Sequence, residues 1–198
     1  LGRLLVELTD GSEAKGLLAL MLLHDSRRDA RTDANGDLVL LEDQERSHWH
    51  RAQIDEALEL VPIALRGGAG IYSLQAAIAA LHARAAHAAD TDWPQIAALY
   101  AELYRRNPSP IIALNHAVAV AMWRGPQAGL DLIEPLRKDL ADYHLWHSAR
   151  ADLLRRLGDR AAAAKAYRDA LALVGSAPER RFLERRLAEA ETGSATST

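Results

Sequence analysis

The chain has 198 residues, of which 49% are apolar and 26% are charged, and this balance excludes intrinsic disorder over most of its length. Its formal net charge of −3 lacks the basic excess of a nucleic-acid-binding domain, and the absence of cysteine excludes disulfides and thiolate metal sites. The sequence has 39 Ala and 32 Leu but only 14 Ile and Val together. Because Ala and Leu favour helices whereas sheets need β-branched residues, we expect an all-α fold.

The N-terminal part of the chain predicts two helices followed by an irregular segment. Residues 1–8 have the pattern of a helix that is already under way, so we expect the chain to be a fragment of a longer protein. A strongly apolar helix is predicted over residues 13–27. Residues 28–43 differ, because Asn35-Gly36 favours a two-residue hairpin turn in which both residues have positive φ. We therefore predict one small β-hairpin or irregular insertion near residues 28–43.

Helical periodicity returns after this segment and continues nearly to the end of the chain. Ser47 is a candidate N-cap of the first of these helices and Asp92 of the third. Pro135 is expected to distort the helix that contains it. The predicted helices cover about residues 47–66, 72–86, 93–106, 110–124, 127–139, 143–157, 159–174 and 178–191. The polar residues 193–198 are expected to be a disordered tail.

The helices are predicted to pair, as in tetratricopeptide-type repeats of about 34 residues. The clearest unit spans residues 144–177, where Gly158 forms the turn and Ala151 faces Ala163. Small residues at these points allow two helices to approach closely, and Tyr167 fills the gap to the next pair. We therefore predict an all-α, tetratricopeptide-like helical-hairpin solenoid, with residues 1–192 as a single helical-repeat domain.

The sequence contains no pattern that points to catalysis. It has no His-Glu-x-x-His motif, no phosphate-binding glycine loop and no Gly-x-Ser-x-Gly elbow, and its eight histidines lack metal-ligand spacing. No apolar run approaches the length of a transmembrane helix. We therefore expect a cytoplasmic protein that is not an enzyme and has no cofactor or bound metal.

Several polar and aromatic residues lie inside apolar helices or beside the irregular segment. In a solenoid such positions often line the face that holds a partner. The alternative interpretation is that these side chains cap helices and satisfy buried backbone groups, and the sequence leaves both open. The candidate partner-contact residues are Arg27, Arg31, Asp43, Gln44, Arg46, Trp49, Gln75, His82, Trp93 and Asn115.

Five segments resemble one known family over nearly the whole chain and in the same order. The chain is similar to the C-terminal, tetratricopeptide-like extension of one group of extracytoplasmic-function (ECF) sigma factors of bacterial RNA polymerase. One departure is His116, where the family favours Arg. The segments are GLLALMLLHDSRRDARTDANGDLVLLEDQERSHW (16–49), YSLQAAIAALHARA (72–85), DTDWPQIAALYAEL (90–103), PSPIIALNHAVAVAM (108–122) and ERRFLERRLAE (179–189).

The resemblance implies a role in transcription initiation. The full-length protein would bring RNA polymerase to promoters, and the sigma regions that read promoter DNA would lie outside this chain. The extension would then regulate sigma activity by contacting the sigma core domains or the polymerase, without binding nucleic acid or membrane itself. A small DGPF-motif protein is a further expected partner, because genes for such proteins often accompany this group.

Two other functions remain open at this point. The chain is alternatively a free-standing tetratricopeptide-like adaptor that binds a peptide or protein partner, or an enzyme on a helical scaffold with a deep pocket. Under the sigma hypothesis, the hairpin and the region around Trp49 are expected to form a contact surface. Substitution of Arg46 and Trp49 would then reduce sigma-dependent transcription without unfolding the protein.

Overall fold

The computed structural model describes residues 1–192, which are helical apart from short turns and one irregular segment. The predicted all-α, solenoid-like class is therefore confirmed. The chain divides into two compact units. The first comprises Leu1–Asn35 and Val39–Asn107, and the second comprises Gly36–Leu38 and the chain from Pro108 onward. The single domain over 1–192 stays a prediction, and the predicted tail at 193–198 lies outside the described residues.

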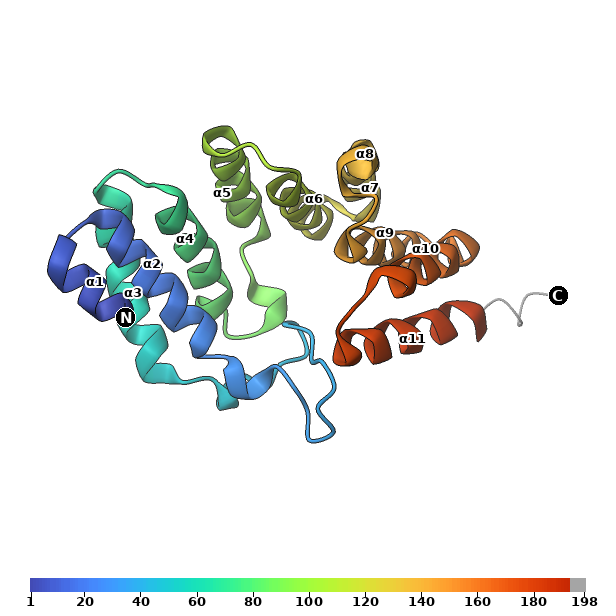
Figure 1. The fold of residues 1–198 in the computed structure, drawn as a ribbon, viewed down its shortest axis with the longest axis horizontal. Helices are drawn as coiled ribbons and strands as arrows, with labels where there is room; N and C mark the ends of the chain where they lie inside the picture. Colours follow the sequence, from blue (N-terminus) through green and yellow to red (C-terminus); the bar gives the residue numbers. More distant parts are fainter. Residues whose placement is uncertain (193–198) are drawn as a thin grey trace. The chain divides into compact units, whose positions relative to one another are not determined.

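Helices of the first unit pack as neighbours along the chain, and α2 lies against both α3 and α4 (Figure 1). Their alanine-rich faces explain this packing, because Ala57 and Ala76 are fully buried and allow close approach. The helices are α1 (Gly2–Thr9), α2 (Ser12–Asp25), α3 (Arg51–Arg66), α4 (Ile71–Arg84) and α5 (Trp93–Arg106), with 3-10 turns η1 (Arg28–Ala30), η2 (Arg46–His48) and η3 (Ala88–Asp90).

The contact between α2 and α4 is fixed by a glycine and a carboxylate. A Cβ atom at Gly16 would lie 2.7 Å from the backbone nitrogen of Ser73, so only glycine fits there. One turn earlier, the Glu13 carboxylate accepts the Tyr72 N–H at 2.9 Å, the Ser73 N–H at 3.1 Å and the Ser73 hydroxyl at 2.5 Å. Glu13 of α2 therefore caps the N-terminus of α4, which no side chain of α4 itself caps.

The irregular segment of residues 28–43 forms no regular hairpin. Single bridge residues occur at Thr32 and Leu38, and the Val39 N–H donates to the Arg31 carbonyl at 2.9 Å. Gly36 has a φ of 75°, but Asn35 does not share this conformation. Among the non-glycine residues of 1–192, only Asp10 and Ala69 have positive φ. The expected Asn35-Gly36 hairpin turn is therefore wrong, because one bridge does not impose the strand twist that selects such a turn.

The predicted helix start at Ser47 is also wrong. Ser47 lies in η2, where its hydroxyl donates to Glu45 at 3.1 Å, and α3 begins only at Arg51. By contrast, Asp92 caps α5 as predicted, because its carboxylate accepts the Gln95 N–H at 3.0 Å. An aspartate at the cap competes better for the free amide than a serine whose hydroxyl already has an acidic partner.

The second unit confirms the helix pair predicted over residues 144–177. Ala151 and Ala163 are fully buried where α9 and α10 meet, Tyr167 is 1% exposed, and Gly158 turns the chain with a φ of 85°. Pro135 breaks the preceding helix as expected. The elements are α6 (Pro110–Arg124), α7 (Pro126–Ile133), η4 (Glu134–Leu136), α8 (Arg137–Leu140), α9 (His144–Arg156), α10 (Arg160–Leu173) and α11 (Ala177–Thr192).

The Glu13 cap makes a testable contribution to stability. Burial raises the pKa of Glu13, but the hydrogen bonds from Ser73 and Tyr72 outweigh it and hold the pKa below its usual value. Glu13→Gln should lower the free energy of unfolding by about 1–2 kcal/mol at neutral pH, measured by urea titration. The difference should shrink as the pH falls through the carboxyl pKa, since protonation removes the same charge. An equal loss in Glu59→Gln, at an exposed position of α3, would contradict this role.

Candidate functional site

A buried tryptophan of the first unit lies against two arginines. Trp49 follows η2, is only 6% exposed, and belongs to the core formed with α2, α3 and α4. The guanidinium carbon of Arg46 lies 4.5 Å from the centroid of the Trp49 ring, and that of Arg27 lies 5.7 Å from it. Cation–π attraction of this kind orients both guanidinium groups on one indole.

Backbone hydrogen bonds hold the two segments that meet at Trp49. Ser26 is fully buried at the end of α2, and its hydroxyl donates to the Leu23 carbonyl at 2.8 Å. The Ser26 carbonyl accepts the His50 N–H at 2.8 Å. Ser26, which precedes Arg27, is thereby bonded to His50, which follows Trp49. This bond holds Arg27 beside the Trp49 ring.

The region extends to the end of α4 and the start of α5. Arg46 donates to the His82 carbonyl at 2.8 Å, and the His82 ring contacts the Trp93 ring edge to face, with centroids 5.2 Å apart. Arg31 donates to the His24 carbonyl at 2.6 Å. We call this group the arginine–tryptophan cluster, and it consists of Arg27, Arg31, Arg46, Trp49, His82 and Trp93.

The arginines of the cluster have no carboxylate of residues 1–192 within ion-pair distance, although Asp90 acts on Arg46 from farther away. Arg27, Arg31 and Arg46 form no ion pair among residues 1–192, whereas nearby Arg28 contacts Asp25 at 3.4 Å. Such a concentration of unpaired cations is unusual in a chain with net negative charge.

The pKa values of neighbouring groups reflect this positive charge. Burial, together with repulsion from Arg31 and Arg46, lowers the pKa of Arg27 to about 10. Burial and the charges of Arg27 and Arg46 lower the pKa of His82 to about 4. Burial, Arg27 and Arg31 likewise lower the pKa of His24. Both histidines are therefore neutral at pH 7, so that the positive charge resides on the arginines.

Three buried polar atoms of the first unit lack a hydrogen-bond partner, one of them the Oε1 atom of Gln53. The other two lie close to η2 in the chain. They are the indole Nε1 of Trp49 and the Oε1 atom of Gln44, whose amide nitrogen donates to the Val39 carbonyl at 3.2 Å. A buried donor without an acceptor costs free energy, and such exceptions in a folded protein call for an explanation.

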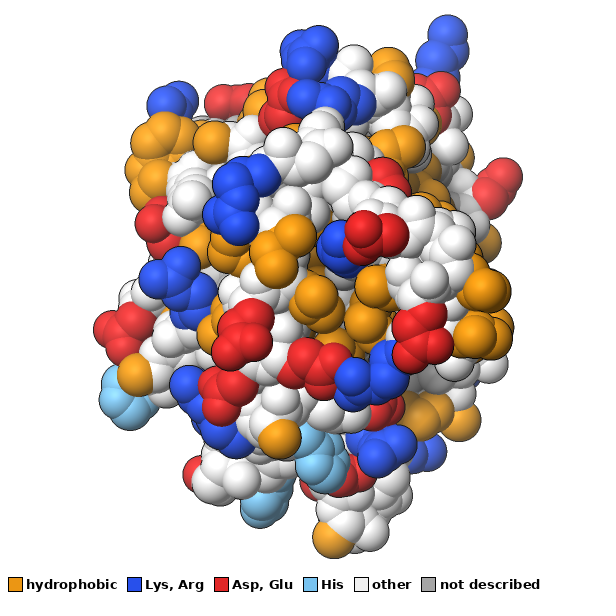
Figure 2. All heavy atoms as spheres, turned by 90° about the vertical axis from the view of Figure 1, so that its left-hand side faces the viewer, with side chains coloured by type: hydrophobic (Ala, Val, Ile, Leu, Met, Phe, Trp, Pro, Cys, Tyr) orange, Lys and Arg blue, Asp and Glu red, His pale blue; other side chains and the backbone are white. Residues whose placement is uncertain are grey.

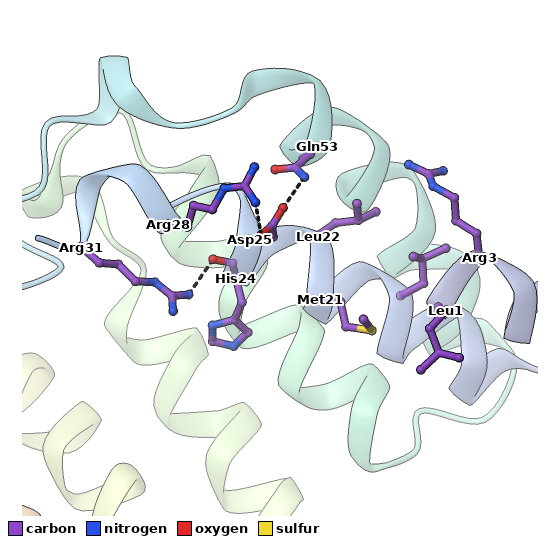
Figure 3. Close-up of a pocket in the computed structure, with 11 residues that line it drawn as sticks. Leu1, Arg3, Met21, Leu22, His24, Asp25, Arg28, Arg31 and Gln53 are labelled. Carbon is purple, nitrogen blue, oxygen red and sulfur yellow. Dashed lines mark hydrogen bonds and ion pairs between the residues drawn. The ribbon is translucent and has the colours of Figure 1, made fainter. Parts of the chain in front are cut away.

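Arg31 also borders a groove of about 550 Å³ between α1 and α2. Figure 3 shows Met21 and Leu22 of α2 on the same side as Leu1, which precedes α1, with Arg31 at one end bonded to the His24 carbonyl. Arg28 in the same groove is paired with Asp25. The groove thus offers apolar side chains next to an arginine that has no carboxylate partner.

The structure brings together six of the ten candidate residues, namely those of the cluster. Gln44 is buried in the loop before η2, whereas Asp43 is exposed there. Gln75 is half-buried on α4, and Asn115 lies on α6 in the other unit. Sequence reasoning misses His24, which lies in the last turn of α2, although its place three residues before Arg27 is a signal in the sequence.

On the face shown in Figure 2, basic and acidic side chains are interspersed around apolar patches. Within residues 1–192, no cluster of three or more His, Asp or Glu side chains is arranged to hold a metal ion. None of the helices over the same residues is long and apolar enough to cross a membrane.

Because Trp49 is buried, we expect its substitution to destabilise the fold. Trp49→Ala should lower the free energy of unfolding by about 3–5 kcal/mol, because it leaves a cavity in the core and removes the support of two guanidiniums. Chemical denaturation measures the loss. Trp123→Ala is the matched control, because Trp123 is 44% exposed. Equal stability of the two variants would show that Trp49 does not support the core.

His82 should make the stability of the protein depend on pH. Between its usual pKa of 6.5 and its folded value of about 4, the unfolded chain binds a proton that the folded chain does not. Stability should therefore rise with pH across this window by up to about 3 kcal/mol and gain nothing from His82 above it. This rise of stability with pH should disappear in His82→Asn, and it should persist in the exposed control His48→Asn. Unfolding curves with the same pH dependence in wild type and His82→Asn would contradict the assignment.

Comparison with known proteins relates the chain to a family of unknown function and to an uncharacterized protein. Residues 1–65 match DUF6596, which is described as a family of unknown function. The chain is 47% identical over 189 residues to an uncharacterized protein of Rhizobium meliloti (strain 1021). This match covers 94% of the chain and 45% of the other protein, so the chain spans less than half the length of that curated relative. No solved structure matches the chain significantly.

Proposed function

We propose that this chain is the regulatory, protein-interaction part of an ECF-type RNA polymerase sigma factor. In this proposal the helical units hold a docking site for the sigma core domains, RNA polymerase or a DGPF-motif protein in the bacterial cytoplasm. The chain itself performs no reaction and does not contact promoter DNA.

The observation that carries the interaction role is the arginine–tryptophan cluster. Arg27 and Arg46 lie against an indole that is 6% exposed, Arg31 lies nearby, and none of the three forms an ion pair with a carboxylate of residues 1–192. Arginine and tryptophan are the residue types most enriched at binding hot spots, where both act from well-supported positions. A rigid framework lowers the entropy cost of binding, which suits a docking site.

The sigma-factor assignment rests on the resemblance of the five segments described above. Segment 16–49 contains all the cluster residues contributed by the α2–η2 region, and segments 72–85 and 90–103 contain His82 and Trp93. The resemblance and the cluster thus involve the same residues. The curated relative has more than half of its length outside the match, which leaves room for further regions in a protein of that size.

Transcription from a sigma-dependent promoter tests this proposal. In the full-length protein, Arg27→Gln combined with Arg31→Gln should lower promoter output several-fold, because the docking charges are lost while Trp49 stays in the core. Arg66→Gln, at an exposed position of α3, removes one charge elsewhere and should leave output unchanged. Unchanged output in a folded double variant would reject the proposed role of the cluster.

A free-standing adaptor is the alternative that the paired helices also support. The coding sequence immediately upstream of Leu1 distinguishes the two. Sigma regions encoded there in the same reading frame are expected under the proposal, whereas a start codon with no sigma region would favour the adaptor.

A further inference from the structure

The donors of the arginine–tryptophan cluster define the kind of group that it accepts. Arg27 and Arg46 present guanidinium N–H groups beside the Trp49 ring, and the buried Trp49 Nε1 has no acceptor. Every one of these atoms is a donor, and neither guanidinium forms an ion pair within 4 Å of a carboxylate of residues 1–192. A planar acceptor with negative charge satisfies such donors best, because arginine binds carboxylates through two parallel hydrogen bonds.

We infer that the arginine–tryptophan cluster binds the carboxylate side chains of an acidic segment in a partner protein. This inference rests on the proposed interaction function and names the chemistry of the partner. Arg27, Arg31 and Arg46 supply the charge and the hydrogen-bond donors, and the buried Trp49 ring holds Arg27 and Arg46 in place.

The charge of the site favours a protein segment over a nucleic acid. A nucleic-acid surface spreads many basic residues along the path of the backbone, because each phosphate needs a partner. Here the unpaired cations are confined to the two residues that flank η1 and to the first residue of η2, in a chain with a net charge of −3. Asp90 also acts on Arg46 and partly offsets its positive charge. Such a site matches one or two carboxylates and not a continuous phosphate chain.

The groove next to Arg31 favours the same class of partner. Arg31 belongs to the cluster and also lines the groove of about 550 Å³, together with the apolar residues Leu18, Met21 and Leu22. A peptide that places an acidic residue on the cluster can place an apolar residue in this groove. Apolar contacts next to a charge-assisted hydrogen bond combine affinity with specificity, as at other protein interfaces.

Binding to a defined peptide tests the inference on the 198-residue chain. The probe is a short fluorescein-labelled peptide in which Glu and Asp alternate with Ala and Leu, and its control has Gln and Asn in place of the acids. A single-stranded DNA oligonucleotide of similar length and label is the third ligand. Fluorescence anisotropy gives the affinities at fixed ionic strength, and the indole N–H signal of Trp49 in an NMR spectrum reports contact at the cluster.

The acidic peptide should bind, whereas its amide counterpart should bind about tenfold more weakly or not at all. Arg27→Gln and Arg31→Gln should each weaken binding of the acidic peptide by about tenfold, and Arg66→Gln should leave it unchanged. Among the four tryptophans, the indole N–H signals of Trp49 and Trp93 should shift, whereas those of Trp123 and Trp146 should not. Arg31 is exposed and bonds only a backbone carbonyl, so Arg31→Gln stays informative if Arg27→Gln unfolds.

Three results would overturn the inference. They are no binding of the acidic peptide, binding that is insensitive to both arginine substitutions, and tighter binding of the DNA oligonucleotide with the same arginine dependence. The transcription assay separates this failure from failure of the proposed function. If the acidic peptide does not bind but promoter output still depends on Arg27 and Arg31, the regulatory function stands and the acidic partner is rejected.

Discussion

The contact of Arg46 and Arg27 with the Trp49 ring is the interaction on which the rest of the site depends. Trp49 is part of the core, so the position of its ring is determined by helix packing and not by the surface. The bond between Ser26 and His50 joins the chain on both sides of the ring. The two guanidiniums are therefore held close together although they repel each other, and the hydrophobic core supplies the free energy that holds them there.

The electrostatic consequence is a site whose positive charge the carboxylates of the folded chain neutralise only in part. Half-buried arginines without carboxylate partners are costly, and mutual repulsion adds to the cost of burial. The neighbouring histidines respond by remaining neutral near pH 7, and the arginines cannot. An anion from outside the chain would relieve this cost, which connects the instability of the site to its proposed function in binding.

Composition and local patterns are sufficient to predict the fold class and most helices. The excess of Ala and Leu predicted an all-α protein, and the small residues Ala151 and Ala163 correctly marked where two helices meet. The errors arose where long-range contacts decide local structure. The cap of α4 comes from Glu13 on another helix, and the segment around Asn35 forms only one bridge, so neither is visible in nearby sequence.

The candidate site was predictable as a set of residue types but not as a geometry. The sequence singled out Trp49, Arg46 and His82, yet it gave no indication that Trp49 is buried or that Arg46 reaches the His82 carbonyl. Asn115 shares their polar character and lies in the other unit. Assignment of these residues to one site needs the packing of α2, α4 and α5, which sequence patterns do not specify.

The most direct measurement of the central claim is the melting temperature in glutarate compared with chloride, at equal ionic strength and pH 7.5. A carboxylate that binds the folded cluster must stabilise it by linkage. We predict that glutarate raises the melting temperature of the wild type by about 2 °C and has no such effect on Arg27→Gln. Equal melting temperatures of the wild type in the two salts, or the same gain in Arg27→Gln, would contradict the account.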